Sequence, residues 1–319
     1  MSRTHLRSRP CLPGAAALLT ALALHPLPGT AQTSEADLLP AGSAAANADT
    51  TAPVDSNVPN GRWFPSGTTF TPLIVAPREV ALRGSLVMTN RKGENHYRET
   101  HAEAEAGIGY RTNVVRLREG SADGLTIDLG FEVGIFSRFY LGKVWRDLIH
   151  AAYRVGAPFS FAYRNWDGRF TLLHVSSHLG DDYLRRFKLT TIRTAQDGFE
   201  LILARWVGAS VRLYGGGYAY FYVSTDGVPR LGGYAGFEWD PEPTGNGTAV
   251  WPFVAAHLGA VKDQDDLAAT GAVGMAVRLG GVVMRWEVRG HTGPSPMGQH
   301  YDTNESFIGI GLQLTPPSW

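Results

Sequence analysis

Residues 124–136, GLTIDLGFEVGIF, alternate between apolar side chains and polar or small ones along their whole length. The odd-numbered positions carry Leu125, Ile127, Leu129, Phe131, Val133 and Ile135. The even-numbered positions carry Thr126, Asp128, Gly130, Glu132, Gly134 and Phe136. Because successive side chains of a β-strand point to opposite faces, this period of two predicts a strand with one apolar and one polar face.

The same alternation recurs along most of the chain. In GGVVMRWEVRG (280–290), Val282, Met284, Trp286 and Val288 oppose Val283, Arg285, Glu287 and Arg289. In YGGGYAYFYV (214–223), the pattern puts Tyr214, Tyr218, Tyr220 and Tyr222 on one face and Phe221 on the other. We expect about twelve strands, near 80–88, 101–116, 124–138, 148–164, 169–178, 199–206, 209–222, 231–239, 250–259, 267–279, 281–290 and 306–314. Several of these segments are longer than usual strands of soluble sheets and suit tilted strands that cross a membrane.

The connections between these segments also alternate in kind. Short or turn-like ones include NWDG (165–168), VGAS (207–210) and Gly280–Gly281, whereas those near 90–98, 139–147, 179–198 and 291–305 are mostly longer and charged. Short turns on one side and longer loops on the other are typical of outer-membrane barrels, whose polar faces line a lumen. The predicted fold class is therefore all-β, an antiparallel outer-membrane β-barrel of about 12 strands. A soluble sandwich or lipocalin-like barrel is the alternative.

The N-terminal region has a different composition. Arg3, Arg7 and Arg9 precede a short apolar run, and small residues follow it, which predicts a signal peptide over residues 1–31. Its cleavage would remove Cys11, the only cysteine of the sequence. Residues 32–62 are rich in Ala, Ser, Asp, Thr and Pro, which predicts a disordered linker before a barrel domain at 63–319. These features predict export to the outer membrane of a Gram-negative bacterium.

Charge and the C-terminal strand restrict the expected partners. The chain has 29 basic and 29 acidic residues, so nothing indicates a nucleic-acid-binding surface. The last predicted strand, SFIGIGLQL (306–314), and the terminal Trp319 resemble the signal that barrel-assembly machinery recognises. We therefore expect this machinery and outer-membrane lipid as partners, and the oligomeric state stays open.

Four segments carry a resemblance to a known family. They are FTPLIVAPRE (70–79), DLIHAAYRVGAPFSF (147–161), LLHVSSHLGDDY (172–183) and GPSPMGQHY (293–301). With these motifs the chain resembles a bacterial family of exported proteins that is classed as a domain of unknown function and expected to form outer-membrane barrels. Ala76 stands where the family usually has an acid. The resemblance implies a fold and a location but no known activity.

The third segment contains a candidate catalytic group. On a strand, His174, Ser176 and His178 share one face near the outer end, so Ser176 could act as a nucleophile and His174 as its general base, oriented by Asp181 or Asp182. This His-x-Ser arrangement is similar to the one in outer-membrane phospholipase A and in lipid A deacylase barrels, which implies hydrolysis of lipid acyl esters. In those families an Asn follows the serine, whereas Ser177 follows Ser176 here, so only His174 and Ser176 match.

Other interpretations of the same residues stay open. His174, His178, Asp181 and Asp182 could hold a cation, with a transition metal or calcium as the candidates. They could also simply satisfy polar groups at the rim of the barrel. GPSPMGQHY predicts a rigid loop in the barrel mouth, with Gln299 as a candidate binding residue near the histidine segment. A channel and a passive scaffold are the non-enzymatic alternatives.

Overall fold

The computed structural model describes residues 60–92, 100–119, 124–142, 146–188, 194–245, 247–262 and 264–316. The predicted signal peptide, most of the predicted linker and Trp319 lie outside the described residues. The strands are β1 (Asn60–Trp63), β2 (Leu82–Lys92), β3 (His101–Arg118), β4 (Thr126–Leu141), β5 (Arg146–Tyr163), β6 (Trp166–Leu179), β7 (Thr194–Val207), β8 (Val211–Val223), β9 (Leu231–Trp239), β10 (Ala249–Val261), β11 (Ala268–Leu279), β12 (Val282–Pro294) and β13 (Asn304–Thr315). One α-helix, α1 (Asp181–Phe187), and one 3-10 helix, η2 (Gly298–His300), lie in the loops.

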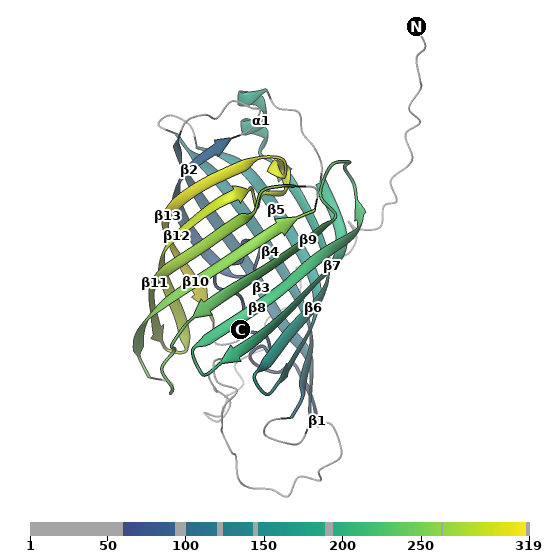
Figure 1. Ribbon diagram of the computed structural model, residues 1–319, viewed down its shortest axis with the longest axis vertical. Coiled ribbons are helices and arrows are strands. Elements are labelled where there is room, and N and C mark those ends of the chain that lie inside the picture. The colour runs from purple at the N-terminus through teal and green to yellow at the C-terminus, as the bar shows by residue number, and fades with distance from the viewer. Residues whose placement is uncertain are drawn as a thin grey trace, which may run out of the picture. The chain divides into compact units, whose positions relative to one another are not determined.

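Twelve of these strands close into an antiparallel barrel (Figure 1). Each of β2 to β12 pairs with the next strand along the chain, and β13 pairs with β2 to close the ring. The short β1 pairs with the far end of β3, beyond its pairing with β2, and includes the last three residues of the range predicted as linker. The predicted fold class and the twelve predicted strands are confirmed. No helix among the described residues is long and apolar enough to cross a membrane.

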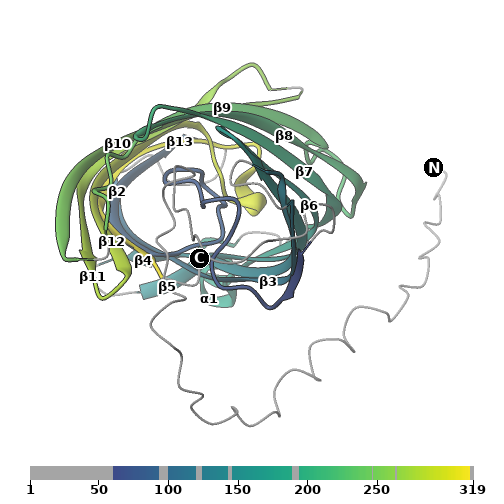
Figure 2. The ribbon, with the colours of Figure 1, turned by 90° about the horizontal axis from the view of Figure 1, so that it is seen from below.

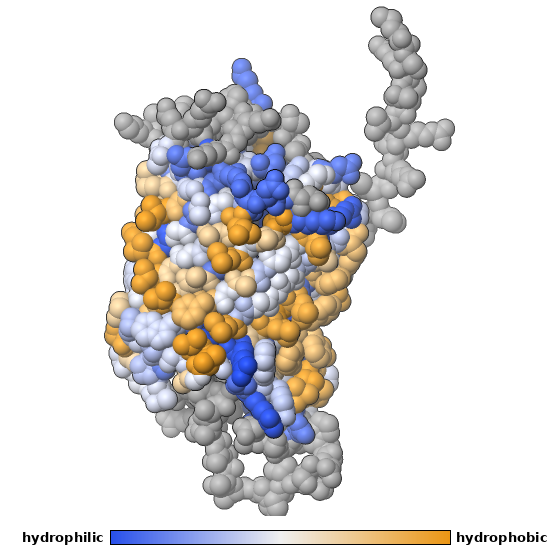
Figure 3. All heavy atoms as spheres, in the orientation of Figure 1, coloured by the Kyte–Doolittle hydropathy of each residue, from blue (hydrophilic) through white to orange (hydrophobic). Residues whose placement is uncertain are grey.

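The alternation that predicted the strands separates the outside of the barrel from its lumen. In β4, Leu129 and Ile135 are 47% and 41% exposed on the outer face, whereas Asp128 and Glu132 are 0% exposed inside. Figure 3 shows hydrophobic side chains over much of the middle of one face and hydrophilic ones toward its upper end. An apolar exterior around a polar interior is the arrangement of membrane barrels and the reverse of a soluble lipocalin-like barrel.

The two ends of the barrel differ. One end, here called the loop end, carries α1, η2 and most of the longer connections (Figure 1). The other, the turn end, carries the two-residue turns at 164–165 and 280–281 and one longer connection, 240–248. Gly280 and Gly281 have φ of 56° and 81°, as a two-residue hairpin turn with two positive φ angles requires. The turn predicted at NWDG lies one residue earlier, at Arg164 and Asn165, because Asp167 belongs to β6 and pairs with Arg212 inside the barrel at 3.0 Å.

Residues 64–81 run inside the ring of strands, as Figure 2 shows from the turn end. Most of this lumen segment is buried, and its contacts come from several strands. Ile74 N donates to Glu238 Oε1 at 2.7 Å, and Arg212 Nη1 donates to the Thr71 carbonyl at 2.8 Å. The Phe70 ring lies between two guanidinium groups, with Arg169 Cζ at 4.7 Å and Arg212 Cζ at 4.4 Å from its centroid. The motif FTPLIVAPRE, including Ala76, therefore fills the lumen.

Glu79 of the lumen segment is part of a closed network of ion pairs at mid-barrel, here called the central network. Its carboxylate bonds Arg111 at 2.9 Å and Arg169 at 2.7 and 2.9 Å. Glu132 bonds Arg111 and Arg154, and Glu200 bonds Arg154 at 2.7 Å. Buried charges need such pairing because an uncompensated charge in a low-dielectric interior is costly.

Candidate functional site

His174, Ser176 and His178 point outward from β6, away from the lumen. The burial along this strand alternates, with Leu173, Val175 and Ser177 buried on the lumen side. The side chain of His174 is 45% exposed. Residues 174–178, here called the histidine segment, therefore place these three side chains on the outer face of the barrel.

The outward histidine has a carboxylate partner on the next strand. Asp197 of β7 is the direct neighbour of His174 in the strand register, and the distance from His174 Nδ1 to Asp197 Oδ1 is 2.6 Å. With Nδ1–H donating to the carboxylate, Nε2 is the nitrogen left to accept a proton. Ser176 lies two residues further along the same face, about 7 Å away between Cα atoms, a span that the two side chains can bridge.

The neighbouring residues on the outer face show where the His174–Asp197 pair lies along the barrel axis. One step toward the turn end, Leu172 is flanked by Ala157 and Phe199, and Phe170 follows beside Phe159 and Leu201, all on the outer face. Toward the loop end, Ser176 and His178 come next, and α1 begins at Asp181. The His174–Asp197 pair thus lies at the boundary between the apolar belt and the polar rim.

Aromatic side chains flank the pair at this boundary. Tyr153 of β5 is the register partner of Ser176, and its ring meets the His178 ring edge at 6.1 Å between centroids. Tyr222 of β8 is the register partner of Asp197 and is 50% exposed. The prediction that Tyr222 shares one face with Tyr214, Tyr218 and Tyr220 is wrong. A β-bulge opposite Asp197 and Gly198 shifts the register, so Tyr222 turns outward. Tyrosines at such levels are typical of membrane interfaces.

The structure does not bring Asp181, Asp182 or Gln299 to His174. Asp181 and Asp182 are exposed in the first turn of α1, where acidic side chains favour a helix N-terminus, and Asp182 pairs with Arg185 at 2.7 Å. Gln299 lies on the lumen side of the wall, where its Nε2 donates to the Ser177 carbonyl at 2.7 Å and to Thr194 Oγ1 at 3.3 Å. The GPSPMGQHY loop thus packs inside the barrel mouth, on the opposite side of β6 from His174.

The glycines of the two motifs have a packing role. A Cβ on Gly180 would overlap the carbonyl oxygen of Leu148, and one on Gly298 would lie 2.6 Å from Ser177 Oγ. At φ of −70° the Gly180 backbone is one that any residue adopts, so the requirement is space rather than a special turn conformation. Among the described residues, no group of three or more His, Cys, Asp or Glu side chains is placed to hold a metal ion.

Asp197 is the site residue that sequence reasoning missed. The predicted strand began at residue 199, which put Asp197 in a loop, whereas β7 begins at Thr194. TAQDG (194–198) has no apolar alternation because its outward positions lie above the apolar belt. One signal in the sequence could have indicated Asp197. It is an acid that lies two residues before the predicted strand 199–206, and that strand follows the one that carries His174.

Comparisons with known proteins identify the family of this chain. A family model described as Protein of unknown function (DUF1207) matches residues 30–315, which confirms the predicted family resemblance. No curated protein matches the chain. Solved structures with similar folds include outer membrane phospholipase A from Escherichia coli, at a TM-score of 0.49 and 12% identity over 75% of this chain and 94% of that one. The outer membrane phospholipase dimer from Salmonella typhi with bound calcium has a TM-score of 0.46 and 13% identity, over 77% of this chain and 94% of that one. The beta domain of the Bordetella autotransporter BrkA has a TM-score of 0.37 and 11% identity, over 73% of this chain and 98% of that one.

Proposed function

Because the chain belongs to the family described as Protein of unknown function (DUF1207), its activity has to be inferred from its own site, and we propose that it is an outer-membrane hydrolase of lipid acyl esters. Ser176 is the nucleophile, His174 the general base and Asp197 the carboxylate that orients the imidazole. The observation that carries the proposal is the 2.6 Å contact between His174 Nδ1 and Asp197 Oδ1 on the outer face, with Ser176 beside it.

The chemistry follows from the order of these three groups. His174 Nε2 takes the proton of the Ser176 hydroxyl as Oγ attacks the ester carbonyl carbon. The tetrahedral intermediate then expels the alcohol of the lipid, which takes that proton from His174, and an acyl-serine remains. Water then attacks the acyl-serine while His174 Nε2 accepts a proton from it. The bond between the acyl carbon and Ser176 Oγ breaks, His174 gives that proton to Oγ, and the fatty acid leaves. Asp197 stabilises the imidazolium that forms in each half-reaction.

The surroundings of the site support a lipid substrate. Leu172 and Phe199 lie one step toward the turn end, where acyl chains would contact the barrel, and the polar rim begins at Ser176. In a bilayer, the ester groups of a lipid lie between its acyl chains and its headgroup. An ester at the level of His174 would therefore reach Ser176 without leaving the membrane, provided that the loop end faces outward from the cell as it does in outer-membrane barrels.

The test uses two neighbouring serines. Full-length protein, refolded in detergent micelles with phospholipid or lipopolysaccharide, is assayed for fatty-acid release with and without calcium. Ser176→Ala should abolish release. Ser177→Ala is the matched control, because Ser177 lies on the lumen side, bonded to Thr194, and the substitution should leave the rate unchanged. Absence of release by folded wild-type protein, or equal release by Ser176→Ala, would contradict the proposal.

A further inference from the structure

A cavity of about 180 Å³ lies in the lumen, behind the wall that carries His174. Leu173 and Val175 of β6 line it on the inner side of that wall. Leu73, Ala76 and Glu79 of the lumen segment line it from within the barrel.

Toward the loop end the cavity continues into a wider vestibule. The two spaces share lining residues from three loops and the adjoining strand end: Val228, Pro229, Gln264, Pro294 and Tyr301. The vestibule is bordered by Arg230, Lys262 and Asp302, among other polar residues. A small solute could reach the cavity from the loop end without crossing the barrel.

The acids that line the cavity are already neutralised by arginines. Glu79 and Glu200 belong to the central network, whose three carboxylates, Glu79, Glu132 and Glu200, face three guanidinium groups, Arg111, Arg154 and Arg169. The network is closed, and its formal charge is zero. It contributes no unpaired charge to the cavity.

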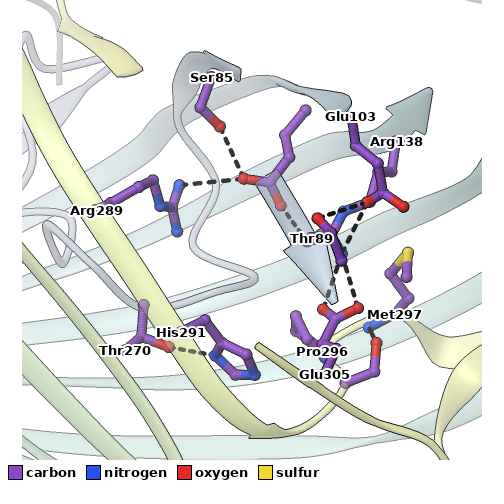
Figure 4. Close-up of polar contacts among 12 residues, drawn as sticks. Ser85, Thr89, Glu103, Arg138, Thr270, Arg289, His291, Pro296, Met297 and Glu305 are labelled. Carbon is purple, nitrogen blue, oxygen red and sulfur yellow. Dashed lines mark hydrogen bonds and ion pairs between the residues drawn. The ribbon is translucent and has the colours of Figure 1, made fainter. Parts of the chain in front are cut away.

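A second network of charged side chains lies toward the loop end and is balanced in the same way. Figure 4 shows part of it, with Glu103, Arg138, Arg289 and Glu305. Glu103 and Glu305 bond Arg91 and Arg138, and Glu105 bonds Arg138 and Ser85. Arg289 lies 3.8 Å from both Glu105 and Glu287. Arg83 adds the fourth positive charge and donates to the carbonyls of Ile74 and Ala76. Four arginines thus stand beside four glutamates, Glu103, Glu105, Glu287 and Glu305.

Arg78 is the charge that neither network balances. It lies in the lumen segment between the two networks and lines the cavity. Its Nε and Nη2 donate to the Pro296 carbonyl at 2.9 and 2.7 Å, and the Tyr220 hydroxyl also contacts it. No carboxylate of the described residues forms an ion pair with it. A guanidinium with only neutral partners in a partly buried site is placed to bind an anion, because its fork matches a carboxylate.

The rest of the lining suits a ring. Tyr218, Tyr220 and Tyr234 contribute aromatic surface from β8 and β9, and Val228 and Pro229 add apolar surface. A dry cavity of about 150 Å³ takes up benzene in an engineered protein. A space of about 180 Å³ therefore accommodates one substituted ring.

We propose that this lumen pocket binds a small organic anion, a carboxylate carried on a single aromatic or apolar ring, with the carboxylate on Arg78 and the ring against the tyrosines. The ligand enters from the loop end. This binding is independent of ester hydrolysis, because the pocket and Ser176 lie on opposite sides of β6.

The test compares three ring compounds of nearly the same shape and different charge. Benzoate, benzamide and benzamidine are titrated into full-length refolded protein by isothermal titration calorimetry. We expect benzoate to bind, benzamide to bind roughly tenfold or more weakly because it lacks the charge-assisted hydrogen bonds, and benzamidine not to bind. Ser176→Ala should bind benzoate as wild type does, so this result does not depend on the proposed hydrolase activity.

Three variants test separately how the Arg78 charge, the space in the cavity and the positive charge at the vestibule contribute to benzoate binding. Arg78→Gln should weaken benzoate binding to the level of benzamide. Gly259→Leu places a larger side chain in the cavity and should remove binding of both compounds. Its Cβ makes only ordinary contacts, 3.8 Å from Ala268 Cβ and 3.9 Å from His257 Nε2, and the binding result is read on variant protein that has refolded into a heat-modifiable barrel. Lys262→Gln removes one positive charge at the vestibule and should change nothing. No binding of benzoate to folded wild type, equal binding of benzoate and benzamide, or unchanged benzoate binding in Gly259→Leu would overturn the proposal.

Discussion

Replacing Asp197 by alanine removes the carboxylate that accepts from His174 Nδ1 and leaves Ser176 and the barrel untouched. Hydrogen bonds to charged groups contribute about 1.5–3 kcal/mol, and a tenfold change in rate corresponds to about 1.4 kcal/mol. The His174 and Asp197 side chains are 45% and 38% exposed, so water competes for both and the lower end of the range applies. We therefore expect kcat/KM to fall about tenfold, far less than the loss in Ser176→Ala.

The assay is fatty-acid release from mixed micelles, with kcat and KM determined separately. Since Asp197 acts on the imidazole and not on the lipid, the change should appear in kcat, with KM unchanged. Asp181→Ala is the matched control, because Asp181 is an exposed acid nearby that does not bond His174. Full activity in Asp197→Ala, or a loss in Asp181→Ala instead, would refute this account of the site.

Three further predictions concern the barrel itself. Gly180→Ala should lower the unfolding temperature because its Cβ would overlap a carbonyl oxygen, whereas Gly247→Ala, with open space around it, should not. Glu79→Gln leaves two buried arginines without a full carboxylate partner, which should destabilise the packing of the lumen segment by about 3 kcal/mol. We therefore expect transient channel openings in planar-bilayer conductance measurements, which should be absent for wild type and for the exposed control Glu119→Gln. Burial and nearby positive charge lower the pKa of His300 to about 4. As the pH falls, the histidine of the unfolded chain therefore binds a proton before that of the folded chain does. The contribution of His300 to the free energy of unfolding is complete above about pH 6.5 and decreases toward pH 4. His300→Gln should make the free energy of unfolding less dependent on pH in this range.

The strands were predictable because one face of every strand meets an apolar environment outside the barrel and the other meets a polar one in the lumen. That contrast produces the alternation in residues 124–136 and in each of the other eleven segments. The lumen segment, residues 64–81, has no such periodicity. Its position depends on partners far away in the sequence, such as Glu238 for the Ile74 amide and Arg212 for the Thr71 carbonyl.

The site was predictable only in part, for a related reason. His174 and Ser176 lie on a strand whose apolar residues mark its register, so their shared face followed from the spacing. Asp197 lies where β7 has left the apolar belt, and the pattern that identifies a strand stops there. Pairing between strands, which sets His174 opposite Asp197, depends on the closed barrel and is not visible in either segment alone.

Covalent labelling of Ser176 tests the central claim most directly. Folded full-length protein is treated with an alkyl fluorophosphonate, which reacts only with an activated serine, and the modified residue is identified by mass spectrometry of the digest. We predict a single adduct on Ser176 that is lost in His174→Ala and retained in Ser177→Ala. A folded barrel that gives no adduct, or one modified at another serine, would contradict the assignment of Ser176, His174 and Asp197 as a catalytic site.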